Sequence, residues 1–252
     1  MGTRRIVDLT GRTALVTGAL GGLGVGICQS LTDAGATVVA TDRVEVVGAW
    51  SEAETPFARA MPLELSLRGT SLLAQLRDIG EAVGQIDILV HNAGIFPRND
   101  LMDVTDQEWD EVMDINLSSA FRLAKALAPE LCTSGRGRIV STSSISWRVG
   151  LTGLSHYQAT KAGLIGFTHS LARELGPAGV TVNAVLPGAF PTAAEEIHED
   201  RVAYEAHILQ SQCLKRRGTA QDLGDVVAFL SSDAAAFITG QSIIVDGGWV
   251  LD

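Results

Sequence analysis

The chain has 252 residues, enough for one well-buried domain, and its composition of 46% hydrophobic and 19% charged residues is ordinary for a soluble globular protein. A formal net charge of −10 without a basic stripe argues against a nucleic-acid partner. No stretch approaches the length of a membrane span, and no apolar region follows the basic residues near the N-terminus. We therefore expect a cytoplasmic protein.

The cysteines and the one basic cluster predict no special chemistry. Cys28, Cys132 and Cys213 match no metal or redox spacing, so we expect buried, reduced thiols and no metal site. The basic cluster 215–217 is short and predicts a solvated turn.

Short β-branched or apolar runs alternate with longer helical patterns along the whole chain. This alternation is typical of βαβ units and predicts an α/β fold, a doubly wound (Rossmann) parallel sheet of seven strands with helices on both faces. No linker divides the chain, so we expect a single domain over residues 1–252. The predicted strands are 13–17, 37–41, 59–63, 86–90, 138–141, 180–185 and 242–245, and the predicted helices include 22–34, 106–131, 155–175 and 220–231.

A glycine cluster with the pattern G-x-x-x-G-x-G lies between the first predicted strand and the first predicted helix. In this place glycines let the backbone approach a pyrophosphate at the helix N-terminus, although a plain tight turn would also account for them. The predicted cofactor-binding residues of this turn are Gly18, Leu20, Gly21, Gly22, Leu23 and Gly24.

Asp42 closes the second predicted strand, where a dinucleotide-binding fold presents an acid to the adenosine ribose. A carboxylate there would repel a 2′-phosphate and favours NAD, whereas the guanidinium of Arg43 could accommodate that phosphate and favours NADP. Since the glycine turn carries no basic residue, NAD is the preferred prediction. The alternative is that Asp42 is an ordinary turn acid.

Three small or polar residues, Asn92, Ala93 and Gly94, follow the fourth predicted strand and suit a backbone lying close to a ligand. The neighbouring His91 is expected to be structural. Asn116 lies inside a predicted helix, where its amide either binds a water molecule or bends the helix.

Tyr157 and Lys161 are four residues apart on a predicted helix, which places both side chains on one face. A cation beside the phenol favours the phenolate and lowers its pKa, so the pair suits proton transfer near neutral pH. A hydroxyl at a strand end, Ser144 with Ser143 as its rival, could contact the same substrate oxygen.

Taken in order, these motifs resemble the short-chain dehydrogenase/reductase family in its compact single-domain branch. The similarity runs from Thr10 to the end of the chain and rests on Thr17-Gly-x-x-x-Gly-x-Gly24, Asn92-Ala-Gly94, Asn116, Ser144, Tyr157-x-x-x-Lys161 and Pro187-Gly188.

The resemblance implies a catalytic role for four residues. Tyr157 would be the acid/base, Lys161 would lower its pKa and hold the nicotinamide ribose, and Ser144 would bind the substrate oxygen. Asn116 would hold a water linked to Lys161. The family spacing between the serine and the tyrosine favours Ser144 over Ser143.

The resemblance also implies further cofactor contacts. Pro187, Gly188, Phe190 and Thr192 would lie against the nicotinamide. Glu64 and Leu65 stand where the family has an Asp-Val pair at the adenine, and Glu64 departs from that pattern.

Substrate choice is expected to come from a lid at about 193–217 and from an apolar pocket. Phe96, Trp147, Phe190 and Tyr204 could line that pocket, although ordinary packing would equally explain each of them. We also expect a homotetramer that forms through the helices 106–131 and 155–175, as the resemblance implies.

The resulting hypothesis is an NAD-dependent oxidoreductase that moves a hydride between the nicotinamide and a secondary alcohol or ketone. The alternative within the same fold is an NADPH-dependent 3-oxoacyl-[carrier protein] reductase. The alternative of another class is a catalytically silent NAD-binding sensor or scaffold.

Overall fold

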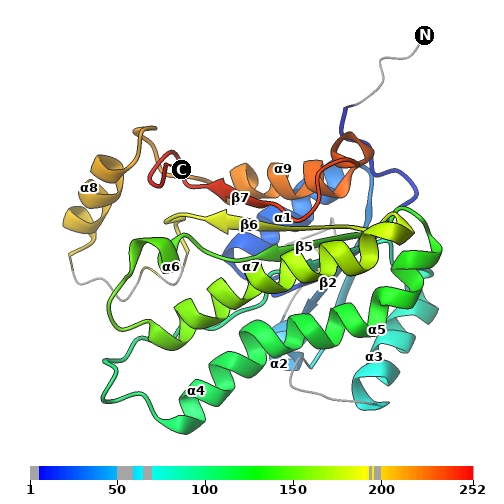
Figure 1. Cartoon of the computed structure of the whole chain (residues 1–252), viewed down its shortest axis with the longest axis horizontal. Helices are drawn as coiled ribbons and strands as arrows, with labels where there is room; N and C mark the ends of the chain where they lie inside the picture. Colours follow the sequence, from blue (N-terminus) through cyan, green and yellow to red (C-terminus); the bar gives the residue numbers. More distant parts are fainter. Residues whose placement is uncertain (1–5, 50–58, 65–69, 193–194, 196–199, 252) are drawn as a thin grey trace.

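The computed structural model describes residues 6–49, 59–64, 70–192, 195 and 200–251. Within these ranges the chain forms one seven-stranded sheet in the order β3-β2-β1-β4-β5-β6-β7, with every neighbouring pair parallel (Figure 1). This architecture confirms the predicted fold class. The strands are β1 (Thr13–Thr17), β2 (Thr37–Asp42), β3 (Arg59–Pro62), β4 (Ile88–His91), β5 (Arg138–Thr142), β6 (Thr181–Pro187) and β7 (Ser242–Val245).

Helices cover both faces of the sheet because successive side chains of a strand point to opposite faces. Ala14 and Val16 belong to the core beneath α1 and α9, whereas Leu15 belongs to the core beneath α3, α5 and α7. The helices are α1 (Gly22–Asp33), α2 (Val44–Ala49), α3 (Thr70–Val83), α4 (Asp106–Met113), α5 (Ser119–Thr133), α6 (Ser146–Val149), α7 (Ser155–Leu175), α8 (Arg201–Ser211) and α9 (Ala220–Ser231).

The predicted helix 106–131 is not a single regular α-helix. It divides into α4 and α5, and between them lies a π-helical turn, η1 (Asp114–Ser118), which contains Asn116. Between β2 and β3 the described part of the chain contains α2, which is six residues long.

The strand order places a topological switch point between β1 and β4. From β1 the chain winds outward to β2 and β3, and it then returns to β4 on the other side of β1. All strands are parallel, so the segments after β1, β4, β5 and β6 emerge at the same edge of the sheet. Ligands of such sheets bind in the crevice at this edge.

The helix that follows the glycine turn is held by an unusually close crossing of α1 and α9. A Cβ atom on Gly26 would lie 2.4 Å from the carbonyl carbon of Ala220, and one on Gly224 would lie 2.3 Å from the Oγ atom of Ser30. Glycine at these two positions therefore lets the backbones of the helices approach each other and fixes the start of α1 over the sheet.

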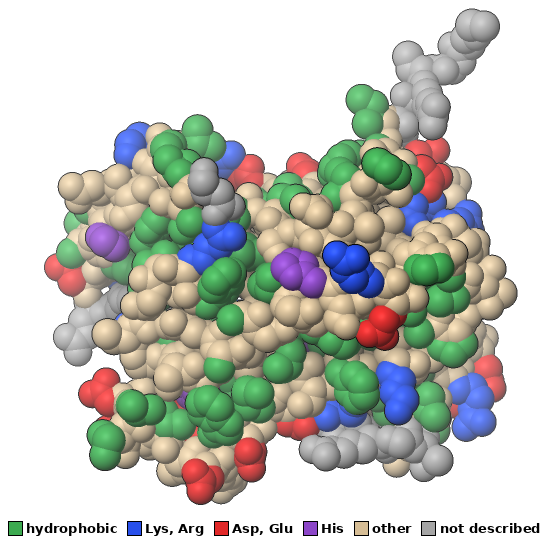
Figure 2. Space-filling model, in the orientation of Figure 1, with side chains coloured by type: hydrophobic (Ala, Val, Ile, Leu, Met, Phe, Trp, Pro, Cys, Tyr) green, Lys and Arg blue, Asp and Glu red, His purple; other side chains and the backbone are tan. Residues whose placement is uncertain are grey.

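The surface and the cysteines agree only in part with the sequence-based expectations. In Figure 2 the Lys and Arg side chains of the visible face are scattered, and acidic side chains gather over α4. Cys28 is buried as expected, but Cys132 is half-buried and Cys213 is exposed. Among the described residues no helix is long and apolar enough to cross a membrane, and the cytoplasmic location stays a prediction.

Candidate active site

The glycine turn after β1 packs directly on the turn after β4. Gly18 has a φ of +58°, and a Cβ there would lie 2.8 Å from the Cα of Ala93. A Cβ on Gly24 would lie 2.2 Å from the carbonyl oxygen of Gly18. Only glycine satisfies both the left-handed conformation and the close approach at Gly18.

The start of α1 suits an anion. Gly21 is its N-cap residue and supplies no side-chain acceptor to the first N–H groups of the helix. Those groups and the helix dipole are the usual partners of a pyrophosphate. A Cβ on Gly22 would lie 2.8 Å from the Cγ2 of Thr192, so the segment after β6 closes over the same turn. This cradle fits a dinucleotide.

Thr17 joins the two turns, a role that the glycine motif did not predict. Its Oγ1 accepts hydrogen bonds from the backbone N–H groups of Asn92 and Ala93, both at 3.1 Å. The Asn92 amide in turn donates to the carbonyl oxygen of Gly18 at 3.0 Å. The only sequence signal for Thr17 is its position directly before the glycine turn.

Asp42 lies at the end of β2 with its carboxylate beside the glycine turn. Its Oδ2 accepts from the N–H of Leu20 at 3.2 Å, and its Oδ1 accepts from the N–H of Arg43 at 2.9 Å. The exposed Arg43 guanidinium pairs with Glu45 at 3.2 Å. The carboxylate is thus fixed in place, while the rival guanidinium has a partner of its own.

Asn116 is fully buried in the π-turn. Its side chain contacts the segment after β4 and does not face solvent. Its Oδ1 accepts from the N–H of Ile95 at 2.8 Å, and its Nδ2 donates to the carbonyl oxygen of Ile95 at 2.8 Å and to the Oγ1 of Thr160 at 3.3 Å. A Cβ on Gly94 would lie 3.3 Å from both the Asn116 Oδ1 and the Lys161 Nζ, so these groups are neighbours. The water-holding role of Asn116 stays a prediction.

His91 supports the same π-turn. Its Nε2 lies 2.7 Å from the Oγ of Ser119, which itself donates to the carbonyl oxygen of Ile115 at 2.5 Å. Because the Ser119 hydroxyl gives its proton to Ile115, it accepts the hydrogen bond from His91. We therefore assign the ring proton of His91 to Nε2. Burial lowers the pKa of His91 to about 3, and the charges of Lys161 and Arg122 add to that effect. The residue is neutral and structural, in agreement with the prediction.

The two serines have different neighbours. Ser144 lies near the Tyr157 hydroxyl, where its hydrogen bonding lowers the tyrosine pKa, and its Oγ accepts from the N–H of Ser146 at 3.1 Å. Ser143 is buried and donates instead to the backbone oxygen of Lys161 at 2.7 Å. Ser144 is thus the serine that contacts the tyrosine.

Lys161 is buried beside Tyr157, with its Nζ 5.5 Å from the centroid of the phenol ring. The Nζ donates to the carbonyl oxygen of Thr142 at 2.8 Å. Burial lowers the pKa of Lys161 to about 8.

The predicted direction of the Tyr157 pKa shift is wrong for this structure. Burial raises the pKa of Tyr157 to about 12, and the hydrogen bond from Ser144 only partly offsets it. The reason is that a phenolate placed at this position in the fold loses hydration. In the neutral form Tyr157 is a proton donor, which suits the reductive direction.

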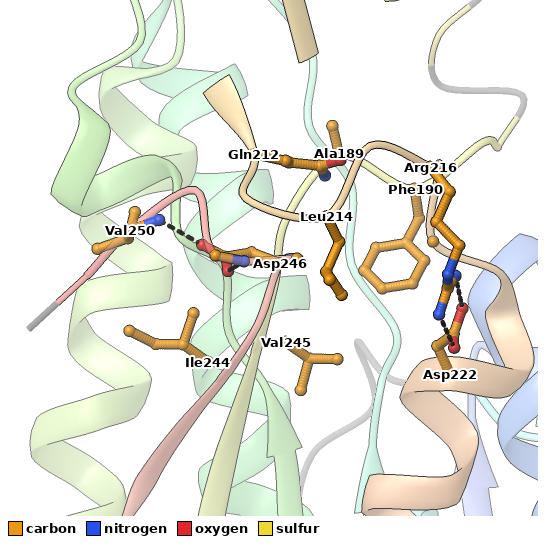
Figure 3. Close-up of a pocket in the computed structure, with 13 residues that line it drawn as sticks. Ala189, Phe190, Gln212, Leu214, Arg216, Asp222, Ile244, Val245, Asp246 and Val250 are labelled. Atoms are coloured by element: carbon orange, nitrogen blue, oxygen red, sulfur yellow. Dashed lines mark hydrogen bonds and ion pairs between the residues drawn. The ribbon is translucent and has the colours of Figure 1, made fainter. Parts of the chain in front are cut away.

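The segment after β6 is held by the loop after β7, and its predicted contact with the nicotinamide stays a prediction. A Cβ on Gly188 would lie 2.7 Å from the Cβ of Asp246, so this segment packs against the loop after β7. Phe190 turns toward Gly218 and lines a cavity of about 390 Å³ at the ends of β6 and β7 (Figure 3). This cavity does not include Ser144, Tyr157 or Lys161 among its lining residues, so the placement of Phe190 supports packing behind the cofactor segment rather than a substrate contact.

The other predicted pocket residues are distributed around the site. Phe96 contacts Tyr157 edge-on, with ring centroids 6.0 Å apart. The guanidinium carbon of Arg148 lies over the Trp147 ring, 5.2 Å from the centroid of that ring. Tyr204 is half-buried on α8, near the charges of Glu195 and Arg217.

The basic cluster 215–217 is not a simple solvated turn. Lys215 donates to carbonyl oxygens at the end of α8, Arg216 pairs with Asp222 at 2.7 Å, and Arg217 pairs with Glu195. These partners lie far from the cluster in sequence or on another element, which is why composition alone did not reveal them.

The predicted adenine contacts are described only in part. The backbone N–H of Glu64 donates to the Oε1 of Gln75 at 3.0 Å. Leu65 lies outside the described residues.

A dinucleotide cradle beside a Ser-Tyr-Lys cluster, on a doubly wound sheet, defines a nicotinamide-dependent oxidoreductase. Residues 18–250 match the family model described as "Enoyl-(Acyl carrier protein) reductase". The chain belongs to the short-chain dehydrogenase/reductase family.

Relatives in this family cover nearly the whole chain. The chain is 40% identical over 244 residues to the 3-oxoacyl-[acyl-carrier-protein] reductase FabG of Escherichia coli (strain K12), covering 96% of this chain and 98% of that protein. It is 38% identical over 244 residues to the FabG protein of Vibrio harveyi, with the same coverage.

Two solved structures share the fold. A putative short-chain alcohol dehydrogenase from Sinorhizobium meliloti 1021 superposes with a TM-score of 0.88 at 36% identity, covering 97% of this chain and 98% of that one. A putative gluconate dehydrogenase from Agrobacterium tumefaciens gives a TM-score of 0.88 at 30% identity, covering 98% of this chain and 100% of that one.

Proposed function

We propose that this protein is an NAD(H)-dependent oxidoreductase that interconverts a ketone and a secondary alcohol, and that a 3-oxoacyl thioester is its first candidate substrate. The observation that carries the proposal is the cluster of Ser144, Tyr157 and Lys161 at the edge of the sheet where the glycine turn lies. A sensor or scaffold that only binds NAD has no need of such a cluster.

The substrate class rests on the relatives. The sequence-based hypothesis placed a generic alcohol dehydrogenase first, but the names of the curated relatives described above favour its alternative, a 3-oxoacyl reductase. The titles of the two similar structures, an alcohol and a gluconate dehydrogenase, keep free secondary alcohols as the second candidate.

The cofactor preference rests on Asp42. Its fixed carboxylate beside Leu20 suits the two ribose hydroxyls of NAD and would repel the 2′-phosphate of NADP. Arg43, the residue that could receive this phosphate, is paired with Glu45. These contacts support NAD(H), and NADP(H) is the alternative.

The residues that would hold the dinucleotide lie along the crevice. The glycine turn and the start of α1 would hold the pyrophosphate, Asp42 the adenosine ribose, Lys161 the nicotinamide ribose and the segment from Pro187 to Thr192 the nicotinamide. When bound, the nicotinamide supplies or accepts a hydride.

The chain's own part in the reaction is to manage the proton. In the reductive direction the neutral Tyr157 hydroxyl gives its proton to the substrate oxygen as the carbonyl carbon gains the hydride, and the product is the secondary alcohol. Ser144 binds the same oxygen and holds it in line with Tyr157. The ammonium group of Lys161 stabilises the phenolate that remains. In the oxidative direction each step is reversed.

Two features of the assembly complete the proposal. The lid at 193–217 includes α8, whose Tyr204 side chain lies near the charges of Glu195 and Arg217, which come from the two ends of the same segment. We also propose a homotetramer through α5 and α7, which is supported by the half-exposed Phe121 and its edge-on contact with Phe167 at 6.4 Å. Light scattering at micromolar concentration tests this, and a monomeric mass would contradict it.

The function is tested by assaying each of two cofactors with each of two substrate classes. Oxidation of NADH and of NADPH is followed with a 3-oxoacyl thioester and with simple ketones, and the reverse reaction is followed with the corresponding alcohols. We expect the highest kcat/KM with NADH and the 3-oxoacyl thioester. Preference for NADPH would refute the cofactor assignment, and dinucleotide binding without any turnover would favour the sensor or scaffold.

A further inference from the structure

His156 is a fully buried titratable residue directly before Tyr157, and the proton transfer described above does not use it. Its Nε2 lies 2.8 Å from the Oε1 of Glu108 on α4. Its Nδ1 is buried and has no hydrogen-bond partner among the residues that the structure describes.

The partner carboxylate is ionised and held from two sides. Asn99 places its amide Nδ2 at 2.9 and 2.8 Å from the two carboxylate oxygens of Glu108. The hydrogen bond from Asn99, followed by the one from His156, lowers the pKa of Glu108. A carboxylate only accepts, so His156 donates from Nε2. The hydrogen bond to Glu108 therefore uses the Nε2 proton of His156.

Glu108 itself is fixed on α4. It is in the first turn of that helix, and its backbone N–H donates to the Oγ1 of the N-cap residue Thr105 at 3.1 Å. The first turn of α7 has no such cap, because the N-cap residue Leu154 offers no side-chain hydrogen bond. The two helices pack against each other (Figure 1), so the bond from His156 to Glu108 supplies lateral support where a cap is missing.

The same carboxylate also holds the segment that covers Tyr157. The backbone N–H of Asn99 donates to the carbonyl oxygen of Gly153 at 3.0 Å, just before α7 begins. Three residues earlier in this segment, Phe96 lies edge-on against the Tyr157 ring. Glu108 therefore ties together the helix turn that carries the tyrosine and the segment that packs on its ring.

From this geometry we infer that the Glu108–His156 pair is a positioning device for Tyr157. Consecutive residues of an α-helix point about 100° apart, so His156 faces α4 while Tyr157 faces the cleft. Locking His156 against α4 fixes the rotation of the first turn of α7 and thereby the direction of the Tyr157 hydroxyl toward Ser144. His156 and Glu108 are positioning residues and do not touch the reacting atoms. The kinetic consequence rests on the proposed function, whereas the structural one does not.

The structural consequence is tested without any substrate. The chain contains only two tyrosines, Tyr157 and Tyr204, so a protein labelled with 3-fluorotyrosine gives two ¹⁹F NMR signals, which Tyr204→Phe assigns. His156→Leu removes the donor, and His156→Gln retains one at the position of Nε2. We expect His156→Leu to shift or broaden the Tyr157 signal, His156→Gln to restore it, and the Tyr204 signal to stay in place.

The kinetic consequence is measured on the same variants with the best ketone substrate. We expect His156→Leu to lower kcat by about 10-fold to 100-fold, as a displacement of about 1 Å does, while the Kd for NADH is unchanged. His156→Gln should recover most of the loss. Ser30→Ala is the matched control, since Ser30 is buried at the distant α1–α9 crossing and its loss should lower stability without changing kcat.

A second variant covers the case in which His156→Leu does not fold. Glu108 is only partly buried, so Glu108→Ala removes the acceptor with less damage to the core and should give the same two effects. A Tyr157 signal and a kcat that match the parent protein in Glu108→Ala or His156→Leu would overturn the inference, as would a His156→Gln variant no better than His156→Leu. If no ketone is turned over, the proposed function fails, and the ¹⁹F signals still decide the positioning role.

Discussion

The Nζ atom of Lys161 lies 5.5 Å from the centroid of the Tyr157 ring and donates a hydrogen bond to the carbonyl oxygen of Thr142 at 2.8 Å. The ammonium group is thus held by the end of β5 at a fixed distance from the phenol. This arrangement places the two residues whose protonation states control the proposed reaction side by side, and both have shifted pKa values.

Replacing Tyr157 by phenylalanine removes the proton donor and keeps the ring that packs on Phe96. We expect kcat to fall by about 100-fold to 10,000-fold, the usual contribution of a positioned acid or base, and the Kd for NADH to change little. Single-turnover kinetics and fluorescence titration measure the two quantities. Ser30→Ala at the distant α1–α9 crossing is the control. Full turnover by Tyr157→Phe would remove the tyrosine from the mechanism.

Replacing Asp42 by alanine removes the carboxylate beside Leu20. The repulsion of a 2′-phosphate disappears with it, so we expect the ratio of kcat/KM for NADH over NADPH to fall by about tenfold, equivalent to about 1.4 kcal/mol. The exposed helix residue Asp33 is the matched acid, and Asp33→Ala should leave the ratio unchanged. An unchanged ratio in Asp42→Ala would mean that this carboxylate does not select the cofactor.

The buried Lys161 makes a pH-dependent contribution to stability. Its pKa is lowered from 10.5 in the unfolded chain to about 8 in the folded protein, so between these values the unfolded state binds more protons. Stability therefore rises with pH in this window, and the cost of burying the ammonium group is fully present below pH 8.

The variant Lys161→Met isolates this contribution. We expect the unfolding free energy of the parent protein, relative to that of Lys161→Met, to increase from about pH 8 to about pH 10. Urea unfolding at a series of pH values measures the difference. A difference that stays flat or decreases across this range would show that Lys161 keeps its ordinary pKa.

The α1–α9 crossing is predicted to tolerate no side chain at Gly26. A Cβ there would lie 2.4 Å from the Ala220 carbonyl carbon and 2.5 Å from its carbonyl oxygen, so Gly26→Ala should destabilise the protein by about 1–3 kcal/mol. Gly80 in α3 has nothing within 4 Å of its Cβ position, and Gly80→Ala should stabilise it by about 0.5–1 kcal/mol. Equal effects of the two substitutions on urea unfolding would contradict the close crossing.

The local sequence was sufficient to predict the helices and strands and the kinds of residue that make up the candidate site. Continuous apolar runs identify strands buried on both faces, because a parallel sheet covered by helices offers each strand no polar side. The spacing of Tyr157 and Lys161 is enough to place them together, because the α-helix repeats every 3.6 residues whatever surrounds it. The glycine turn is equally local, since the conformation of Gly18 is a property of its own backbone.

Other features depend on contacts between residues far apart in the chain, and only the tertiary structure decided them. Ser144 and Ser143 are adjacent and chemically alike, and the fold alone directs one to Tyr157 and the other to the backbone of Lys161. The pKa of Tyr157 is raised instead of lowered because burial depends on the whole packed core. The bond between His156 and Glu108 joins positions 48 residues apart, and no local pattern encodes it.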